Sequence, residues 1–196
     1  MARLREWAEG LVESVREWCQ GRSPWARAPL AAYLLYAGIR HLASHDYRSW
    51  FYGITLGVHE LGHLLFMPFG QTLHLLGGSL MQLVAPLAAA LYLLLKQRDW
   101  FGLAVGGSWL AFSTWELATY VGDANREELP LVGFDDAPLH DWATLLAQWH
   151  LINQTDTIAA AIRVVAFVLW VASMALGSWT LWLMWRAQRA ATSPKR

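Results

Sequence analysis

The hydrophobic residues of this chain are collected in long blocks that are separated by short polar stretches. A helix needs about 20 mostly apolar residues to cross the hydrocarbon core of a bilayer. A shorter run at 30–39 is followed at once by charged and histidine residues, so it either crosses the membrane or lies at its interface. Four longer runs approach the spanning length, at 50–69, 78–95, 100–121 and 164–185. The pattern predicts an all-α polytopic membrane protein, a bundle of about 4–6 transmembrane helices.

The first 22 residues follow a different pattern, in which apolar side chains recur at helical spacing and charged side chains occupy the other positions. The apolar residues that share this face are Leu4, Trp7, Leu11, Val15, Trp18 and Cys19. We expect an amphipathic helix that lies on the membrane surface or packs against the bundle. Gly21, Pro24 and Pro29 interrupt it. The chain therefore divides into an N-terminal helix at 1–22 and a single integral-membrane domain at 23–196, in which 142–152 is a second short amphipathic helix.

The composition supports this interpretation and excludes other classes of protein. Hydrophobic residues make up 56% of the 196 and charged residues 15%, whereas soluble domains carry about 25% charged residues. The net charge is zero, so nothing indicates nucleic acid as a partner, and the lipid bilayer is the expected surroundings. Cys19 is the one cysteine, which excludes a disulfide framework and a cysteine-ligated zinc site. The compact layout favours a multi-pass protein of a bacterial-type cytoplasmic membrane, and the oligomeric state stays open.

Ionisable residues stand in the middle of the first long run, where they are costly unless they have a function. His59-Glu60-Leu61-Gly62-His63 matches the pattern H-E-x-x-H. On a helix the two histidines share a face, so both imidazoles can bind one ion. Glu60 lies beside that ion and is placed to take a proton from a water molecule that the metal activates. Imidazole and carboxylate ligands suit Zn²⁺, so we expect one zinc ion per chain.

A third ligand has to come from elsewhere in the chain. We rank Asp123, at the end of the third long run, ahead of His140, because a carboxylate at a helix end is well held. Asp141 ranks below His140, and either could instead contact a ligand or the substrate. Asp135 and Asp136 rank lowest, since they lie in a turn-like segment. Glu116, seven residues before Asp123, is a further carboxylate that could orient a histidine, bind substrate or hold two helices together.

The segment that follows the motif is rich in glycine. Gly70, Gly77 and Gly78 argue against a simple helix before about residue 79. We therefore expect a short re-entrant or extended segment at 71–76, which lines a cavity and could pair with an unwound substrate strand.

These features resemble those of the site-2-protease type of intramembrane zinc metalloprotease, of which this chain would be a compact, divergent relative. His59, Glu60 and His63 match the motif of that family on a membrane helix. The stretch 77–87 stands where the family has Gly-Pro-x-x-Asn, with Gly78 and Gln82 in comparable places, and Asp123 stands where the family has its aspartate ligand.

The resemblance implies a zinc-dependent metalloendopeptidase that hydrolyses peptide bonds of membrane-protein or peptide substrates in or near the bilayer. His59, His63 and Asp123 would hold the zinc, and Glu60 would activate the water. Two alternatives stay open. One is a membrane zinc hydrolase of a non-peptide substrate such as a lipid amide, and the other is a non-enzymatic metal-binding scaffold.

Overall fold

The described part of the chain, residues 1–131 and 139–192 of a computed structural model, is all-helical, as predicted, and contains no β-strand. The elements are α1 (Ala2–Cys19), α2 (Ala28–Ala43), α3 (Tyr52–Phe66), the short 3₁₀ helix η1 (Met67–Phe69), α4 (Gln71–Gln97), α5 (Trp100–Asp123), α6 (Asp141–Gln148), the 3₁₀ helix η2 (Ile152–Gln154) and α7 (Thr155–Thr192).

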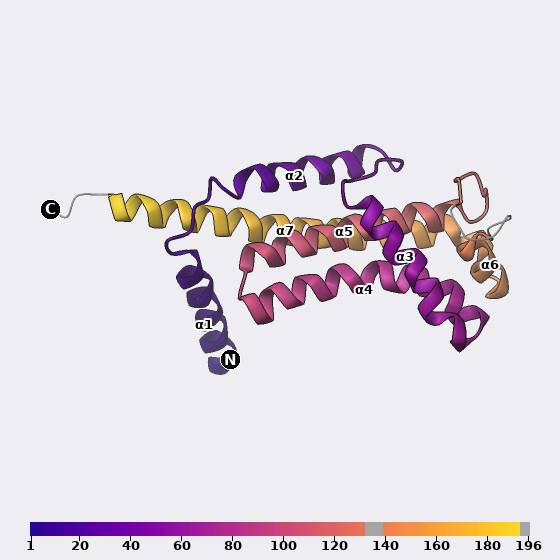
Figure 1. The fold of residues 1–196 in the computed structure, drawn as a ribbon, viewed down its shortest axis with the longest axis horizontal. Helices are drawn as coiled ribbons and strands as arrows, with labels where there is room; N and C mark the ends of the chain where they lie inside the picture. The colour runs from indigo at the N-terminus through magenta and orange to yellow at the C-terminus, as the bar shows by residue number, and fades with distance from the viewer. Residues whose placement is uncertain (132–138, 193–196) are drawn as a thin grey trace.

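Helix α5 is the centre of the fold. It packs most extensively on α7 and also contacts α4, so these three long helices lie side by side (Figure 1). Helix α2 lies along the side of α5 and α7 that is opposite to α4, and α3 crosses obliquely against α4 (Figure 1). Phe112 and Trp115 of α5 pack between α2 and α7, against Leu34 and Trp170. The C-terminal end of α5 packs against α6 and the start of α7. The polar residues gather at this end.

The two predicted amphipathic helices are present. Helix α1 occupies most of the range 1–22, where Val15 and Cys19 are buried against Met184 of α7, while Leu4 and Trp7 are exposed. Helix α6 begins one residue before the predicted range 142–152 and ends at Gln148. The short run 30–39 lies inside α2.

The prediction that 71–76 is extended, with no simple helix before about residue 79, is wrong. Gly70 has φ of +93° and turns the chain, but α4 begins at Gln71 and continues through Gly77 and Gly78 without interruption. These glycines instead allow two helices to pack closely. A Cβ on Gly62 of α3 would collide with the carbonyl group of Gly77, so the absence of side chains lets the two helix backbones touch at their crossing.

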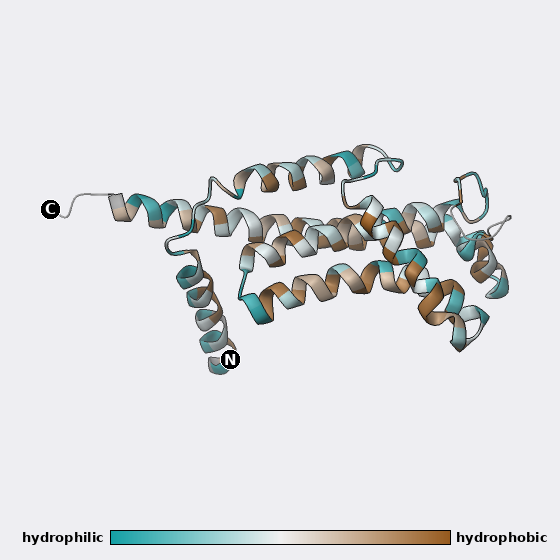
Figure 2. Cartoon of the chain, viewed as in Figure 1, coloured by the Kyte–Doolittle hydropathy of each residue, from teal (hydrophilic) through white to brown (hydrophobic). Residues whose placement is uncertain are grey.

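Two helical segments of the described residues are long and apolar enough to cross a membrane, judged by length and composition: Gln71–Gln97 and Ile152–Ala191. The predicted bundle of about 4–6 transmembrane helices is therefore not confirmed by this criterion. The second segment exceeds the predicted run 164–185 at both ends. Figure 2 shows strongly hydrophobic residues along α3 and α4, and hydrophilic ones on the connections and toward the C-terminal end of α7.

Candidate metal centre

The two histidines of the H-E-x-x-H motif face α4 from α3. They are one helical turn apart, and their rings lie 4.8 Å apart between centroids. Gly78 of α4 lies directly opposite them. A Cβ built on Gly78 would stand 2.5 Å from Nε2 of His63 and 2.6 Å from Nε2 of His59. The close crossing of α3 and α4 therefore leaves room for these two nitrogens only because residue 78 has no side chain.

Hydrogen bonds at Nδ1 determine which nitrogen of each imidazole ring carries the proton. Nδ1 of His63 lies 2.8 Å from the main-chain oxygen of His74, which can only accept, so His63 Nδ1 carries the proton. Nδ1 of His59 lies 2.9 Å from Oε1 of Gln82, whose Nε2 donates to the main-chain oxygen of Ser113 at 2.8 Å. His59 Nδ1 is therefore also the donor. In the neutral form of each ring, Nε2 therefore presents its lone pair on the side away from these partners.

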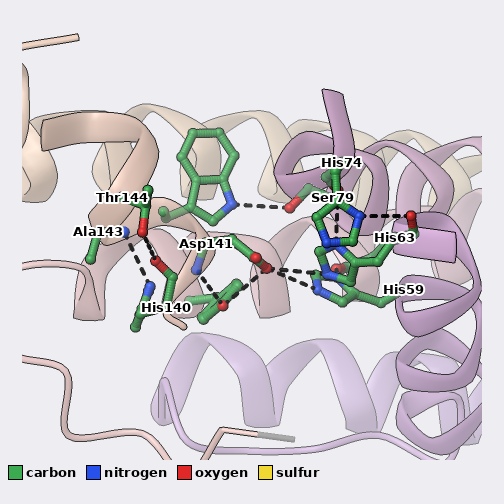
Figure 3. A network of polar contacts seen from close by, with 11 residues as sticks. His59, His63, His74, Ser79, His140, Asp141, Ala143 and Thr144 are labelled. Atoms are coloured by element: carbon green, nitrogen blue, oxygen red, sulfur yellow. Dashed lines mark hydrogen bonds and ion pairs between the residues drawn. The ribbon is translucent and has the colours of Figure 1, made fainter. Parts of the chain in front are cut away.

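A carboxylate from α6 meets these two lone pairs. Oδ2 of Asp141 lies 3.3 Å from His63 Nε2 and 3.5 Å from His59 Nε2 (Figure 3). The hydroxyl of Tyr120, on α5, donates to the same oxygen at 3.1 Å and accepts from the main-chain N–H of Asp141 at 3.0 Å. Burial raises the pKa of Asp141, but hydrogen bonding and the charges of His59 and His63 outweigh it and lower the pKa to about 2. Asp141 is therefore a carboxylate at neutral pH.

Helix α6 is held so that Asp141 faces the histidines. Leu146 of α6 packs against Val121 of α5 and Ala159 of α7, within one buried apolar cluster. On another face of α6, Nε1 of Trp142 donates to Oγ of Ser79 on α4 at 3.0 Å (Figure 3). These contacts join α6 to the three long helices and leave its first residue, Asp141, against the face of α3 that carries the two histidines.

His59, His63 and Asp141 form a group that could hold a metal ion, because one ligand atom from each lies within 4.8 Å of the others. Two imidazole lone pairs and an anionic oxygen repel one another, so their convergence is favourable only with positive charge between them, supplied by protons on Nε2 or by a metal ion. The spacing also fits. Ligand atoms about 2.05 Å from a tetrahedral zinc ion lie about 3.3 Å apart, close to the two distances from Asp141 Oδ2.

The structure revises the order of the third-ligand candidates. Asp123, the first choice from the sequence, lies against His140 instead of the motif histidines, with 3.5 Å between its Oδ2 and His140 Nε2. Its two oxygens accept the main-chain N–H groups of Glu128 and Leu129. Asp123 therefore fixes the start of the loop after α5, and the residue ranked last of the three, Asp141, joins the histidines. Asp135 and Asp136 lie outside the described residues.

His140 contributes to the position of its neighbour. Its Nδ1 accepts the main-chain N–H of Ala143 at 3.2 Å, which caps the start of α6 (Figure 3). Burial lowers the pKa of His140, although the charges of nearby acidic residues oppose this, so the ring is neutral. Its Nε2 lies 3.5 Å from Asp123 Oδ2 and has no hydrogen-bond partner among the described residues. The ring also stacks on Tyr120, with 4.3 Å between the centroids. His140 thus connects Asp123, Tyr120 and the first turn of α6.

A cavity of about 560 Å³ opens beside the metal-ligand group. Glu60 and Glu116 line it together with His59, His63 and Asp141. Its apolar wall comes mainly from leucines of α3, α4 and the loop after α5, which are Leu56, Leu64, Leu75, Leu129, Leu131 and Leu139. Water and a substrate can therefore reach the fourth side of the group, and Glu60 is available on the wall of the same cavity.

Sequence reasoning missed two residues that support the site. Tyr120 holds Asp141, but nothing in its neighbourhood in the sequence distinguishes it from an interfacial tyrosine. His74, in the first turn of α4, is the second of these residues. His74 and His63 form two reciprocal hydrogen bonds. Nδ1 of His74 donates to the main-chain oxygen of His63 at 2.9 Å, and Nδ1 of His63 donates to the main-chain oxygen of His74 at 2.8 Å. Gln82 was recognised only as a counterpart of an asparagine in the resembled family.

No family model, curated protein or solved structure matches this chain. The assignment of a function therefore depends on the geometry of this site.

Proposed function

We propose that this protein is a zinc-dependent metalloendopeptidase that hydrolyses peptide bonds within or near a membrane. One observation carries the proposal: two imidazole nitrogens and one carboxylate oxygen converge beside a cavity, and the glutamate of the motif lines that cavity. A structural zinc site has four protein ligands, whereas a catalytic one has three and an open side. Within the described residues this group has three members.

The donor set supports zinc more than the alternatives. Neutral imidazole with carboxylate suits Zn²⁺, whereas Mg²⁺ and Ca²⁺ prefer oxygen ligands alone. When bound, zinc would polarise the scissile carbonyl group and make a water molecule acidic enough to attack near neutral pH. Gln82 and the main-chain oxygen of His74 fix the two imidazoles in the tautomer that a metal needs.

The residues of the chain would do the remaining chemistry. The carboxylate of Glu60 would accept a proton from the attacking water and later deliver it to the nitrogen of the leaving amine. The hydroxyl of Tyr120 holds Asp141 in place and lines the cavity, so it is also within reach of a bound substrate. The apolar wall of the cavity would exclude bulk water around the reacting bond.

Exposed apolar side chains support a multi-pass arrangement in which α3 and α5 cross the membrane together with α4 and α7. Helix α3 exposes Ile54, Leu61, Leu64 and Leu65, and α4 exposes Leu80, Val84, Leu87, Leu91 and Leu95. A soluble protein rarely exposes such contiguous apolar surface. Because α5 is largely buried by its neighbours, lipid would contact mainly α3, α4 and α7. The metal group would then lie close to one end of the bundle.

The test is zinc content, measured by elemental analysis on protein purified without chelators. We expect about one zinc per chain in the wild type, and its loss in His59→Ala and Asp141→Ala. Asp123→Asn is the matched control, since it removes a nearby buried carboxylate that does not face the histidines, and it should retain the zinc. A wild type that binds no zinc after reloading would refute the proposal.

Activity needs a separate test in liposomes or detergent with membrane-protein and peptide substrates. Glu60→Gln should keep its zinc but lose cleavage, by a factor on the order of 10² or more for a lost general base. Turnover of lipid amides without peptide cleavage would contradict peptidase activity and favour a different hydrolase. If the wild type and Glu60→Gln both bind zinc and neither hydrolyses any substrate, the result would favour a metal-binding scaffold.

A further inference from the structure

A second carboxylate in the cavity has no partner. Glu116 of α5 is 7% exposed and lines the cavity. Neither Oε1 nor Oε2 has a hydrogen-bond partner among the residues that the structure describes. Buried carboxylates are normally paired or hydrogen-bonded, because removing them from water is costly. An unpaired one on a cavity wall therefore indicates a group that binds a ligand.

The nearest candidate for a protein partner is engaged elsewhere. Arg48 lines the same cavity. Its Nη1 lies 3.4 Å from the main-chain oxygens of both His45 and Tyr47, and its guanidinium stacks over the ring of Tyr52 at 5.1 Å. No ion pair joins Arg48 to Glu116 within the described residues. Glu116 consequently remains available to a positive charge or a donor that enters the cavity.

Glu116 lies close to the metal-ligand group along α5. It lies one helical turn before Tyr120, about 6 Å along α5, and Tyr120 contacts Asp141. Thr55 of α3, one turn before His59, lines the cavity, and its hydroxyl lies 3.3 Å from that of Ser113, three residues before Glu116 on α5. A short alkyl chain can therefore lie along this wall, with one end at Glu116 and the other near His59.

Acidic residues outnumber basic ones on the cavity wall. Glu60, Glu116 and Asp141 line the cavity, whereas Arg48 is the one lysine or arginine among the described lining residues. This excess of negative charge attracts a cation and repels an anion.

We propose that Glu116 forms a subsite for a primary ammonium group of the peptide substrate, either a lysine side chain or a free amino terminus. This inference rests on the proposed peptidase function for the identity of the substrate, but the subsite itself does not. An ammonium group would donate to both oxygens of Glu116, and a hydrogen bond of this kind to a charged group is stronger than a neutral one.

The first experiment measures binding without catalysis. Hexylamine and 1-hexanol are titrated calorimetrically into the full-length protein in detergent at neutral pH. The variants are Glu116→Gln, which keeps the shape of the side chain, and Glu128→Gln, which removes an equal charge outside the cavity wall. Zinc-free wild type, prepared with a chelator, is included because an amine can also bind the metal directly.

We expect hexylammonium to bind the zinc-loaded wild type, the zinc-free wild type and Glu128→Gln with similar affinity. Glu116→Gln should bind it about 10- to 100-fold more weakly, as is typical for loss of a hydrogen bond to a charged group. Hexanol should bind weakly and equally to all four samples. Equal binding of hexylamine to the wild type and Glu116→Gln would overturn the proposal, as would its loss in the zinc-free wild type, which would place the amine on the metal.

The second experiment identifies the source of the ammonium group. Peptide pairs differ only in lysine against norleucine, or in a free against an acetylated amino terminus. For the wild type, the KM of the ammonium-bearing member should be at least about tenfold lower than that of its partner peptide. Glu116→Gln should cleave both members of a pair with the same KM. If amine binding depends on Glu116 but neither pair is distinguished, the peptide source is wrong. If no peptide is cleaved, the peptidase proposal fails and the amine titration still decides the subsite.

Discussion

Replacing Gly78 with alanine should abolish the proposed metal binding while leaving the helices in place. The new Cβ would stand 2.5 Å and 2.6 Å from the Nε2 atoms of His63 and His59, about 0.9 Å and 0.8 Å closer than the 3.4 Å at which ordinary contact begins. Metal ligands tolerate displacements of only about 0.2 Å. Both ligand nitrogens would therefore have to move by several times this tolerance.

Neither ring can turn aside without further loss, because Gln82 and the main-chain oxygen of His74 hold the Nδ1 atoms. Breaking one such hydrogen bond costs about 0.5–1.5 kcal/mol. Overpacking at a close helix crossing typically costs about 1–3 kcal/mol. The metal-free protein should thus be destabilised modestly, whereas zinc affinity should fall by more than the roughly 10- to 100-fold seen when only a supporting hydrogen bond is removed.

The assay is zinc affinity by competition with a chromogenic chelator, with helix content and Tm measured on the same samples. Gly57→Ala is the matched control, because Gly57 lies on α3 two residues before His59 and nothing approaches its Cβ position within 4 Å. It should bind zinc like the wild type. If Gly78→Ala binds zinc with unchanged affinity, the histidines do not face α4 as described, and the geometry of the proposed site is wrong.

Two further predictions concern a supporting contact and a buried thiol. Gln82→Ala removes the acceptor of the His59 Nδ1 proton and should weaken zinc binding about 10- to 100-fold without abolishing it, measured by the same competition; unchanged affinity would contradict the inferred tautomer. Burial raises the pKa of Cys19 from 9.0 to about 11, although Arg22 and Arg27 oppose the shift, so at pH 8 the folded protein should hold about 100-fold less thiolate than a free cysteine. Iodoacetamide should therefore label Cys19 slowly at pH 8 and faster as pH rises toward 11, and rapid labelling of the folded protein at pH 8 would contradict its burial against Thr180.

The wrong prediction at residues 71–76 shows that the helix propensity of one segment does not decide its structure. Glycine lowers helix propensity by about 1 kcal/mol relative to alanine, so Gly77 and Gly78 favoured a break in the sequence analysis. In the structure the contact between α3 and α4 outweighs this cost, because only glycines permit the approach of Gly62 to Gly77. Propensity belongs to one segment, whereas the benefit of the glycines appears only when the second helix is present.

The sequence ranked Asp123 first as the third ligand, whereas the structure brings Asp141 to the two histidines, and the reason is related. Asp123 ends a long helix, and a carboxylate there is well held, as expected. It is held by the loop that follows, through Glu128 and Leu129, and by His140, so it does not face the motif. Which of several acidic residues reaches a distant histidine pair depends on the path of the loop between α5 and α6, and that path leaves no periodic signal in the sequence.

The sequence by itself determined the features that repeat locally: the helices, whose apolar residues recur every three to four positions, and the two histidines of the motif, which a helix necessarily places on one face. It also identified His59, Glu60 and His63 as candidate chemistry. Only the tertiary structure decided that Asp141 joins the histidines, that Gly78 makes room for their nitrogens, and that Glu116 lies unpaired on the cavity wall. These depend on contacts between helices that are far apart in the chain, and such contacts are determined by packing of the whole bundle rather than by the residues next to each position.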